Sequence, residues 1–439
     1  MFNPTIYRSY DIRGVVPDEF DPEEAYHIGR AYAQYIKPKT VVVARDMRPT
    51  GDQFEPELIR GLQEGGVNVI RIGLASTPLF YFAVHTLKAD GGIMVTASHN
   101  PGKYNGMKMT RAQAVPIGAP SGLMDIRDLV EKRQWQPVDT KGTIEEANVL
   151  SAYVEMVTEG TSAQGLTTVV DAGNGMTGMI LPNVFERLGG KVIPLYWELD
   201  GTFPNHEADP LKEENMRDLQ KAVKEEGANW GVAFDGDRVF FCTEKGEIIP
   251  GDITTALIAR EVLREQPGKS IVYDVRASNT TKEAIEEVGG KPVIWKVGHS
   301  NIKPKMRELD APFAGEVSGH FFFAPWYAES GMLAMNYMLR LMEREKKPLS
   351  EIVAPFLRYA KTPEINFEVA DKEMVLKNIK ERFADAQFNE IDGIRFDYPT
   401  WWASVRASNT EPLLRLNMEA KTQELLDEKR AEIEQLITA

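Results

Sequence analysis

One pattern of strand, polar loop, helix, Gly-Gly and strand occurs three times in this chain, and it constrains the fold more than any other feature. The three copies cover residues 40–70, 167–193 and 270–294. In each copy a glycine pair stands where the helix ends and the second strand begins, which is typical of right-handed parallel β-α-β units. The repeat therefore predicts three related α/β domains with mostly parallel sheets.

Each copy is followed by a further apolar strand that ends in a polar loop. These segments cover residues 91–99, 231–238 and 312–320. Ligands of open parallel sheets bind beyond the carboxyl ends of the strands. We therefore expect the three loops to line one central cleft.

The pattern changes after residue 362. Residues 364–369 alternate as a strand does, a helix follows, and residues 401–405 and 413–418 are expected to form further strands before a charged final helix. This order predicts a C-terminal antiparallel α+β domain. A chain of 439 residues is too long for one hydrophobic core. We divide it into four domains, at residues 1–142, 143–252, 253–361 and 362–439.

Composition excludes several classes of function. The formal net charge of −14 disfavours a nucleic-acid partner, because such binding normally requires a basic surface. The single cysteine, Cys242, excludes an internal disulfide and a cysteine-based zinc site, and its apolar flanks indicate a buried strand thiol. No segment has the pattern of a signal peptide or of a membrane span. We expect a cytoplasmic protein without a membrane partner.

The loop Thr96-Ala97-Ser98-His99-Asn100-Pro101 contains the most reactive combination of side chains. A hydroxyl at the end of a strand, with an imidazole, amides and Lys108 nearby, can act on a small anionic substrate. Adjacent Ser and His residues alone are more typical of a solvated loop. An anionic substrate would need basic residues gathered around it in so acidic a protein. Candidates stand in short loops: Arg8, Arg13, Arg45, Arg48, Lys108, Arg238, Lys296 and Arg406.

Several motifs together resemble the α-D-phosphohexomutase superfamily. They are TASHNP at 96–101, AFDGDR at 233–238, GEVSGH at 315–320 and RASNTEP at 406–412. The strings YRSYDIRG, FPNHEADP and KVGHS, at 7–14, 203–210 and 296–300, make the chain similar to the bacterial phosphomannomutase/phosphoglucomutase branch. The resemblance covers nearly the whole chain, in order.

The resemblance implies an isomerase that interconverts hexose 1-phosphate and 6-phosphate, of mannose, glucose or both. Such an enzyme is a phosphoprotein whose phosphoserine, here Ser98, donates its phosphoryl group to a hexose phosphate. A hexose 1,6-bisphosphate then turns over and returns the other phosphate to the serine. Phosphoryl transfer mainly needs positioning and charge stabilisation, and the loops supply suitable groups. Either a monomer or a homodimer is compatible with the sequence.

The same resemblance assigns roles to individual residues. It implies that Glu316 and Ser318 bind sugar hydroxyls and that the loop from Arg406 binds the non-reacting phosphate. The implied catalytic residues are Ser98, Lys108, His299 and Arg13. The implied substrate-binding residues are Tyr10, Lys296, Glu316, Ser318, His320, Arg406, Ser408, Asn409 and Thr410. The implied ligands of Mg²⁺ are Ser98, Asp235 and Asp237, with Arg238 near the metal.

The metal loop departs from the family pattern. The family has Asp-Gly-Asp-x-Asp-Arg, whereas this chain has Asp235-Gly236-Asp237-Arg238, so two residues and one carboxylate are absent. Fewer anionic ligands should weaken Mg²⁺ binding. Three interpretations follow: a natural variation with activity retained, weakened metal binding with impaired transfer, or an alteration of the chain at this point.

We also consider two alternative functions. One is a sugar-phosphate-binding homologue with impaired catalysis, and another is an aminosugar-phosphate mutase of the same superfamily. Two histidines also have structural interpretations. His320 precedes Phe321-Phe322-Phe323 and is compatible with a core histidine, and His206 is better explained as a structural loop residue than as a catalyst.

Overall fold

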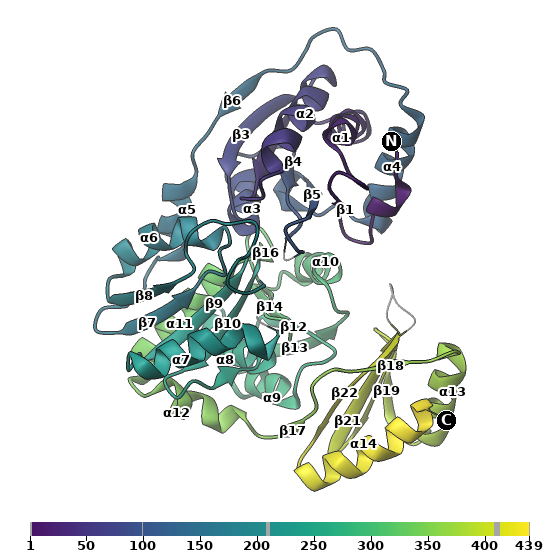
Figure 1. Cartoon of the computed structure of the whole chain (residues 1–439). Helices are drawn as coiled ribbons and strands as arrows, with labels where there is room; N and C mark the ends of the chain where they lie inside the picture. The colour runs from purple at the N-terminus through teal and green to yellow at the C-terminus, as the bar shows by residue number, and fades with distance from the viewer. Residues whose placement is uncertain (1, 99, 208–210, 408–412, 439) are drawn as a thin grey trace. The chain divides into compact units, whose positions relative to one another are not determined.

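The computed structural model describes residues 2–98, 100–207, 211–407 and 413–438 (Figure 1). The chain forms two compact units. Unit 1 consists of Met1–Ile248 and His320–Leu349, and unit 2 of Ile249–Gly319 and Ser350–Ala439. No helix among the described residues is long and apolar enough to cross a membrane.

The N-terminal sheet of unit 1 has parallel strands at its centre and antiparallel strands at one edge. Its order is β1-β5-β4-β2-β3-β6, with β2 parallel to β3 and β4, and β5 antiparallel to β4 and β1. The strands are β1 (Ile12–Val15), β2 (Thr40–Arg45), β3 (Asn68–Leu74), β4 (Gly91–Val95), β5 (Tyr104–Arg111) and β6 (Ile144–Glu146). The helices are α1 (Pro22–Ile36), α2 (Gly51–Glu64), α3 (Thr77–Thr86) and α4 (Leu123–Lys132).

Local chemistry explains why these elements form. Val41, Val42 and Val43 are fully buried, as expected for a central strand rich in β-branched residues. Helices α1 and α2 cross closely at glycines: a Cβ on Gly61 would lie 2.2 Å from the carbonyl oxygen of Tyr26. A side chain larger than hydrogen at that position would therefore push the two helices apart.

The second sheet of unit 1 repeats the parallel arrangement. Strand β7 pairs in parallel with β8 and β9, and β10 returns antiparallel to β9. The strands are β7 (Thr167–Asp171), β8 (Lys191–Leu195), β9 (Trp230–Asp235) and β10 (Arg238–Thr243), with β11 (Ile248–Ile249) following in the chain. The helices are α5 (Leu150–Val157), α6 (Thr177–Leu188) and α7 (Arg217–Glu225). Cys242 is fully buried on β10, which confirms the predicted strand thiol, and burial raises the pKa of its thiol to about 12.

Unit 1 is completed by a later part of the chain. Strands β15 (Phe321–Phe323) and β16 (Ala328–Glu329) pair antiparallel and lead into α11 (Gly331–Glu345). Asn336 on α11 donates hydrogen bonds to the carbonyl oxygens of Val157 and Glu159, at 2.9 and 3.2 Å. These bonds join α11 to the end of α5.

Unit 2 begins with the third α/β repeat. Strand β12 pairs in parallel with β13 and β14. The elements are α8 (Gly251–Glu265), β12 (Ser270–Asp274), α9 (Asn279–Glu287), β13 (Lys291–Trp295), α10 (His299–Leu309) and β14 (Phe313–Gly315), and α12 (Leu349–Val353) follows later in the chain.

The C-terminal part of unit 2 is an antiparallel sheet covered by helices. Its order is β17-β22-β21-β20-β19, and β18 also pairs with β22. Side chains of both C-terminal helices pack into one core with the sheet. The elements are β17 (Ala360–Lys361), β18 (Ile365–Glu368), α13 (Lys372–Arg382), β19 (Gln387–Asn389), β20 (Ile394–Tyr398), β21 (Trp401–Ala407), β22 (Leu413–Ala420) and α14 (Gln423–Thr438).

The predicted fold class is confirmed. All three strand-helix-strand repeats form parallel pairs, and the chain after residue 362 is antiparallel α+β. Strands β19 and β20 were not predicted. Strand β19 has only three residues, and β20 contains the charged Arg395 and Asp397, so neither shows a clear apolar strand pattern in the sequence.

Candidate active site

Ser98 stands on a tightly held loop after β4. Its backbone has φ of +50°, in the left-handed region that residues other than glycine seldom adopt. The Ser98 N–H donates a 2.9 Å hydrogen bond to Thr96 Oγ1, and that hydroxyl donates at 2.6 Å to Asp46 Oδ2. These two hydrogen bonds hold the backbone of the partly buried Ser98 in place.

Two arginines hold the same loop through hydrogen bonds. Arg48 is fully buried and donates to the backbone oxygens of Ser98 at 2.7 Å and of Pro101 at 2.9 Å. Arg13, on β1, donates to the backbone oxygen of Ala97 and to the side chain of Asn100. Arg48 is therefore a support of the serine loop, whereas the sequence indicated only a basic residue in a short loop.

The predicted metal loop, residues 235–238, forms a two-residue hairpin turn. Asp235 ends β9 and Arg238 begins β10, and the two residues are paired across the strands. Gly236 has φ of +49°, which suits glycine in a tight hairpin. Asp235, Asp237 and Arg238 are all buried.

Both carboxylates of this hairpin are paired with basic side chains. Asp235 Oδ2 accepts a 2.5 Å hydrogen bond from Arg238 Nε. Asp237 Oδ2 lies 3.2 Å from the Nζ of Lys108, a residue of β5 that is also buried. His320 Nε2 lies 3.6 Å from the other oxygen of Asp237, and that oxygen accepts no hydrogen bond among the described residues.

These pairs set the protonation states of the buried groups. Burial by itself would raise the pKa of Asp237, but Lys108, His320 and Arg238 hold it well below its usual range. Burial would likewise lower the pKa of Lys108, but Asp237 and Asp11 keep it above its usual range. Near neutral pH, Lys108 is therefore an ammonium and Asp237 a carboxylate.

The serine loop and the hairpin share one small cavity. It has a volume of about 30 Å³, and Thr96, Ser98, Asp235 and Gly236 are among its lining residues. A volume of this size holds a single water molecule or ion. The residues that the sequence predicted for phosphoryl transfer in unit 1 therefore lie together.

The donors present do not fit the Mg²⁺ ion that the resemblance implies. Mg²⁺ requires six oxygen ligands in near-ideal octahedral geometry, usually including carboxylates. The described residues contain no group of three or more His, Cys, Asp or Glu side chains that could hold a metal. Arg238 and Lys108 already neutralise the two aspartates, so the hairpin has little residual negative charge to attract a cation.

Most of the predicted substrate-binding residues lie in unit 2, whereas Tyr10 and His320 lie in unit 1. Glu316, which follows β14, is buried, and its Oε1 accepts a 2.7 Å hydrogen bond from the Gly298 N–H. This bond fixes the segment from Lys296 to His299 beside Glu316. Lys296 is exposed, and Ser318 is partly buried. Tyr10 is in unit 1 and is 38% exposed.

The predicted phosphate loop begins at the end of β21. Arg406 is buried there, and its Nη2 donates a 2.8 Å hydrogen bond to Glu364 Oε2. Its Nη1 lies 3.5 Å from Asp392 Oδ2. Ser408, Asn409 and Thr410 lie outside the described residues.

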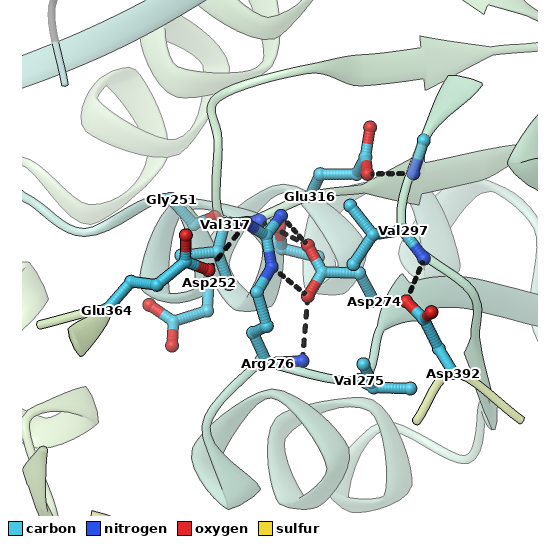
Figure 2. Close-up of polar contacts among 12 residues, drawn as sticks. Gly251, Asp252, Asp274, Val275, Arg276, Val297, Glu316, Val317, Glu364 and Asp392 are labelled. Carbon is cyan, nitrogen blue, oxygen red and sulfur yellow. Dashed lines mark hydrogen bonds and ion pairs between the residues drawn. The ribbon is translucent and has the colours of Figure 1, made fainter. Parts of the chain in front are cut away.

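Sequence reasoning missed the carboxylates that hold this second group of residues. Figure 2 shows Asp274 beside Arg276 and Val317, Asp392 beside Val297, and Glu364 on the other side of Arg276. Asp274 accepts hydrogen bonds from Arg276 Nη2 and from the Val317 N–H, both at 2.8 Å. The only available signal was position, because Asp274 ends β12 where a parallel sheet places its binding residues.

Known proteins match the chain along its whole length. Four sequence families described as phosphoglucomutase/phosphomannomutase match in order: alpha/beta/alpha domain I at residues 4–136, domain II at 150–246, domain III at 250–359, and the C-terminal domain at 364–436. The chain belongs to the phosphoglucomutase/phosphomannomutase family. This confirms the family resemblance seen in the motifs.

Individual relatives agree with this membership. A Pseudomonas aeruginosa protein named phosphomannomutase/phosphoglucomutase is 40% identical over 437 residues, which cover 96% of this chain and 93% of that protein. A Methanocaldococcus jannaschii phosphomannomutase is 38% identical, with 98% and 97% covered. The crystal structure of a phosphoglucomutase/phosphomannomutase family protein from Burkholderia thailandensis superimposes with a TM-score of 0.92 at 34% identity, covering 99% of this chain and 97% of that one.

Proposed function

We propose that this chain is a hexose-phosphate mutase that interconverts the 1- and 6-phosphates of mannose, glucose or both. Its carrier of the phosphoryl group is Ser98. The proposal is supported by full-length relatives that are named phosphomannomutase or phosphomannomutase/phosphoglucomutase. One observation links this function to particular residues. The Ser98 loop, which has a strained backbone and is held by an arginine, lies beside Lys108 and the Asp235–Arg238 hairpin. We also propose that the chain has four domains, at residues 1–142, 143–252, 253–361 and 362–439.

The reaction consists of two phosphoryl transfers, first from Ser98 to the sugar and then from the sugar to Ser98. In the first, the bond between phosphorus and Ser98 Oγ breaks, and a bond forms between phosphorus and a hydroxyl oxygen of the hexose phosphate. The sugar hydroxyl gives up its proton and Ser98 Oγ takes one, so the serine hydroxyl is restored. In the second, the other phosphate of the bisphosphate moves to Ser98, and the proton movements are reversed.

Lys108 acts in this scheme as a cation and a proton donor. Its pKa lies above the usual range, so it carries a proton near neutral pH. An ammonium beside the reacting phosphate stabilises its charge and can protonate the leaving oxygen of Ser98. His299 and Arg13 complete the proposed catalytic set, and His299 is the candidate to accept the proton of the sugar hydroxyl.

Residues of unit 2, together with Tyr10 and His320, bind the substrate in this proposal. Glu316 and Ser318 hold sugar hydroxyls, and Lys296 adds a positive charge. Arg406 binds the phosphate that does not react, because a guanidinium makes strong paired hydrogen bonds to phosphate oxygens. Ser408, Asn409 and Thr410 are proposed to contribute further donors to that phosphate.

A metal ion enters the proposal only as a weakly held component. The family resemblance implies Mg²⁺ at Ser98, Asp235 and Asp237, but the described donors do not fit a tight site. We therefore propose that the hairpin alone binds little or no Mg²⁺ and that the phosphate of phospho-Ser98, together with water, supplies the missing ligands for weak binding.

A ³¹P NMR experiment tests the proposed function. The purified chain is incubated with mannose 6-phosphate, a trace of glucose 1,6-bisphosphate to phosphorylate Ser98, and Mg²⁺. We expect the signal of mannose 1-phosphate to appear and to reach a constant ratio to the 6-phosphate. Binding of mannose 6-phosphate without any interconversion, and without interconversion of the glucose phosphates, would refute the proposal and identify a sugar-phosphate-binding homologue.

A further inference from the structure

Glu364 lies among three arginines in unit 2. It stands between β17 and β18, and its Oε2 accepts the 2.8 Å hydrogen bond from Arg406. The same oxygen lies 3.8 Å from Arg276 Nη1, and Oε1 lies 3.5 Å from Arg415 Nη1. We call Arg276, Arg406 and Arg415 the arginine cluster.

Two members of the arginine cluster face each other across paired strands, and their repulsion favours an anion between them. Arg406 on β21 and Arg415 on β22 face each other directly across the antiparallel pair. Like charges at directly opposed positions destabilise a sheet. The side chains of Arg406 and Arg276 are only 8% and 12% exposed, so water screens their charges poorly.

The other nearby carboxylates are held by the backbone. Asp274 is fully buried and accepts the N–H of Val317, and Asp392 accepts the N–H of Val297 at 3.1 Å (Figure 2). Glu364 differs from both. Its side chain is 28% exposed, and its partners among the described residues are the three guanidinium groups alone. It is therefore the carboxylate that can leave the cluster without breaking backbone hydrogen bonds.

We propose that Glu364 is the exchangeable counter-ion of the arginine cluster and competes with a phosphate group for Arg406. The identity of that group as the non-reacting phosphate of the substrate rests on the proposed function. When no phosphate is bound, the carboxylate neutralises the buried guanidiniums. A phosphate dianion brings more charge and more acceptor oxygens than a carboxylate, so it displaces Glu364 into solvent. Weaker monoanions do not, and Glu364 thereby sets the selectivity of the site.

The test measures binding of inorganic phosphate to the full-length dephosphorylated chain by isothermal titration. Glu364→Gln keeps the shape of the side chain and removes its charge. We expect the dissociation constant for phosphate to fall roughly fivefold, since a partly exposed ion pair contributes up to about 1 kcal/mol. Glu364→Asp keeps the charge on a shorter side chain, and we expect a smaller decrease with this variant.

Two further variants locate the effect. Glu368→Gln makes the same charge change at an exposed position of β18, and we expect it to leave phosphate binding unchanged. In an Arg406→Ala background, Glu364→Gln should no longer tighten binding. A weaker or unchanged affinity in Glu364→Gln would overturn the proposal, because it would mean that Glu364 positions Arg406 or does not compete.

The design separates this inference from the proposed function. Phosphate binding is measured without turnover, so tighter binding in Glu364→Gln supports the counter-ion role even if the chain fails to interconvert hexose phosphates. If the chain is active, the same variant should lower KM for mannose 6-phosphate and leave kcat within about twofold. A fall in kcat with unchanged KM would contradict competition for the phosphate.

Discussion

At the scale of single residues, buried charges of this protein serve two purposes. Arg48 is fully buried and donates hydrogen bonds to the backbone oxygens of Ser98 and Pro101, so it stabilises the conformation of the Ser98 loop. Lys108 is also buried, but it faces one carboxylate, Asp237, across 3.2 Å. This ion pair keeps Lys108 protonated, which suits its proposed role as a cation beside the reacting phosphate.

The first prediction concerns Ser98. Ser98→Ala should reduce the interconversion of mannose 1- and 6-phosphate by at least about four orders of magnitude, because no other group replaces the phosphoryl carrier. The rate is measured by ³¹P NMR, and the melting temperature should stay close to that of the wild type. Ser151→Ala, at an exposed position of α5, is the matched control and should retain full activity. Substantial turnover by Ser98→Ala would exclude this serine as the carrier.

The second prediction concerns His206, which the structure supports as a structural residue. Its Nε2 lies 3.0 Å from Asp171 Oδ2, and this hydrogen bond raises the pKa of His206 above its usual value. The stabilisation is therefore complete below the unfolded pKa of about 6.5 and is lost as the pH rises through the higher folded pKa. We expect His206→Gln to lower the melting temperature by about 2 °C near pH 6 and by less near pH 9.

The partner of His206 provides the control. In an Asp171→Asn background the carboxylate is absent, so His206→Gln should have the same small effect at both pH values. A melting-temperature difference that grows toward high pH would show that the neutral imidazole is the stabilising form, contrary to this prediction.

At the scale of elements, the turn between β9 and β10 has the largest chemical consequence. Its two residues, Gly236 and Asp237, are too few to form an open loop, so the strands stay paired up to Asp235 and Arg238. The short turn directs Asp235 to Arg238 and Asp237 to Lys108.

The third prediction lengthens this turn. A Gly-Asp pair inserted between Asp237 and Arg238 restores the family spacing and adds a carboxylate. We expect the affinity for Mg²⁺ to rise by about tenfold or more, and kcat to rise with it, because the ion gains an anionic ligand. The native dephosphorylated chain should show little or no binding of Mg²⁺ in isothermal titration.

A second insertion separates loop length from ligand chemistry. A Gly-Ser pair at the same place lengthens the turn without a carboxylate and should leave Mg²⁺ affinity near the native value. Tight Mg²⁺ binding by the native dephosphorylated chain would disprove the weak-binding proposal, and so would an absence of any change with Gly-Asp.

At the scale of the whole molecule, the proposed reaction needs residues from both units. Unit 1 contains the proposed phosphoryl carrier Ser98 and Lys108, and unit 2 contains Glu316 and Arg406. In the proposed reaction, the guanidinium of Arg406 binds the non-reacting phosphate of both the 1-phosphate and the 6-phosphate. Loss of Arg406 should therefore affect both isomers.

The fourth prediction tests this symmetry. Arg406→Ala should raise KM for mannose 1-phosphate and for mannose 6-phosphate by roughly tenfold to a hundredfold, since charge-assisted hydrogen bonds contribute about 1.5–3 kcal/mol. Steady-state kinetics in each direction provide the measurement. Arg430→Ala on α14, where the side chain is 43% exposed, is the control and should leave both constants unchanged. An increase for one isomer only would show that Arg406 does not serve both binding modes.

Local sequence patterns were enough to predict the repeated strand-helix-strand order, the antiparallel C-terminal domain and the position of Ser98 after a strand. Each of these depends on neighbouring residues, through side-chain alternation, glycine at helix ends and strand termini. The pairing of buried charges, by contrast, depends on how distant segments pack. Lys108 and Asp237 are 129 residues apart, and Glu364 and Arg406 are 42 apart. No local sequence pattern predicts such contacts, because they form only when distant segments pack together.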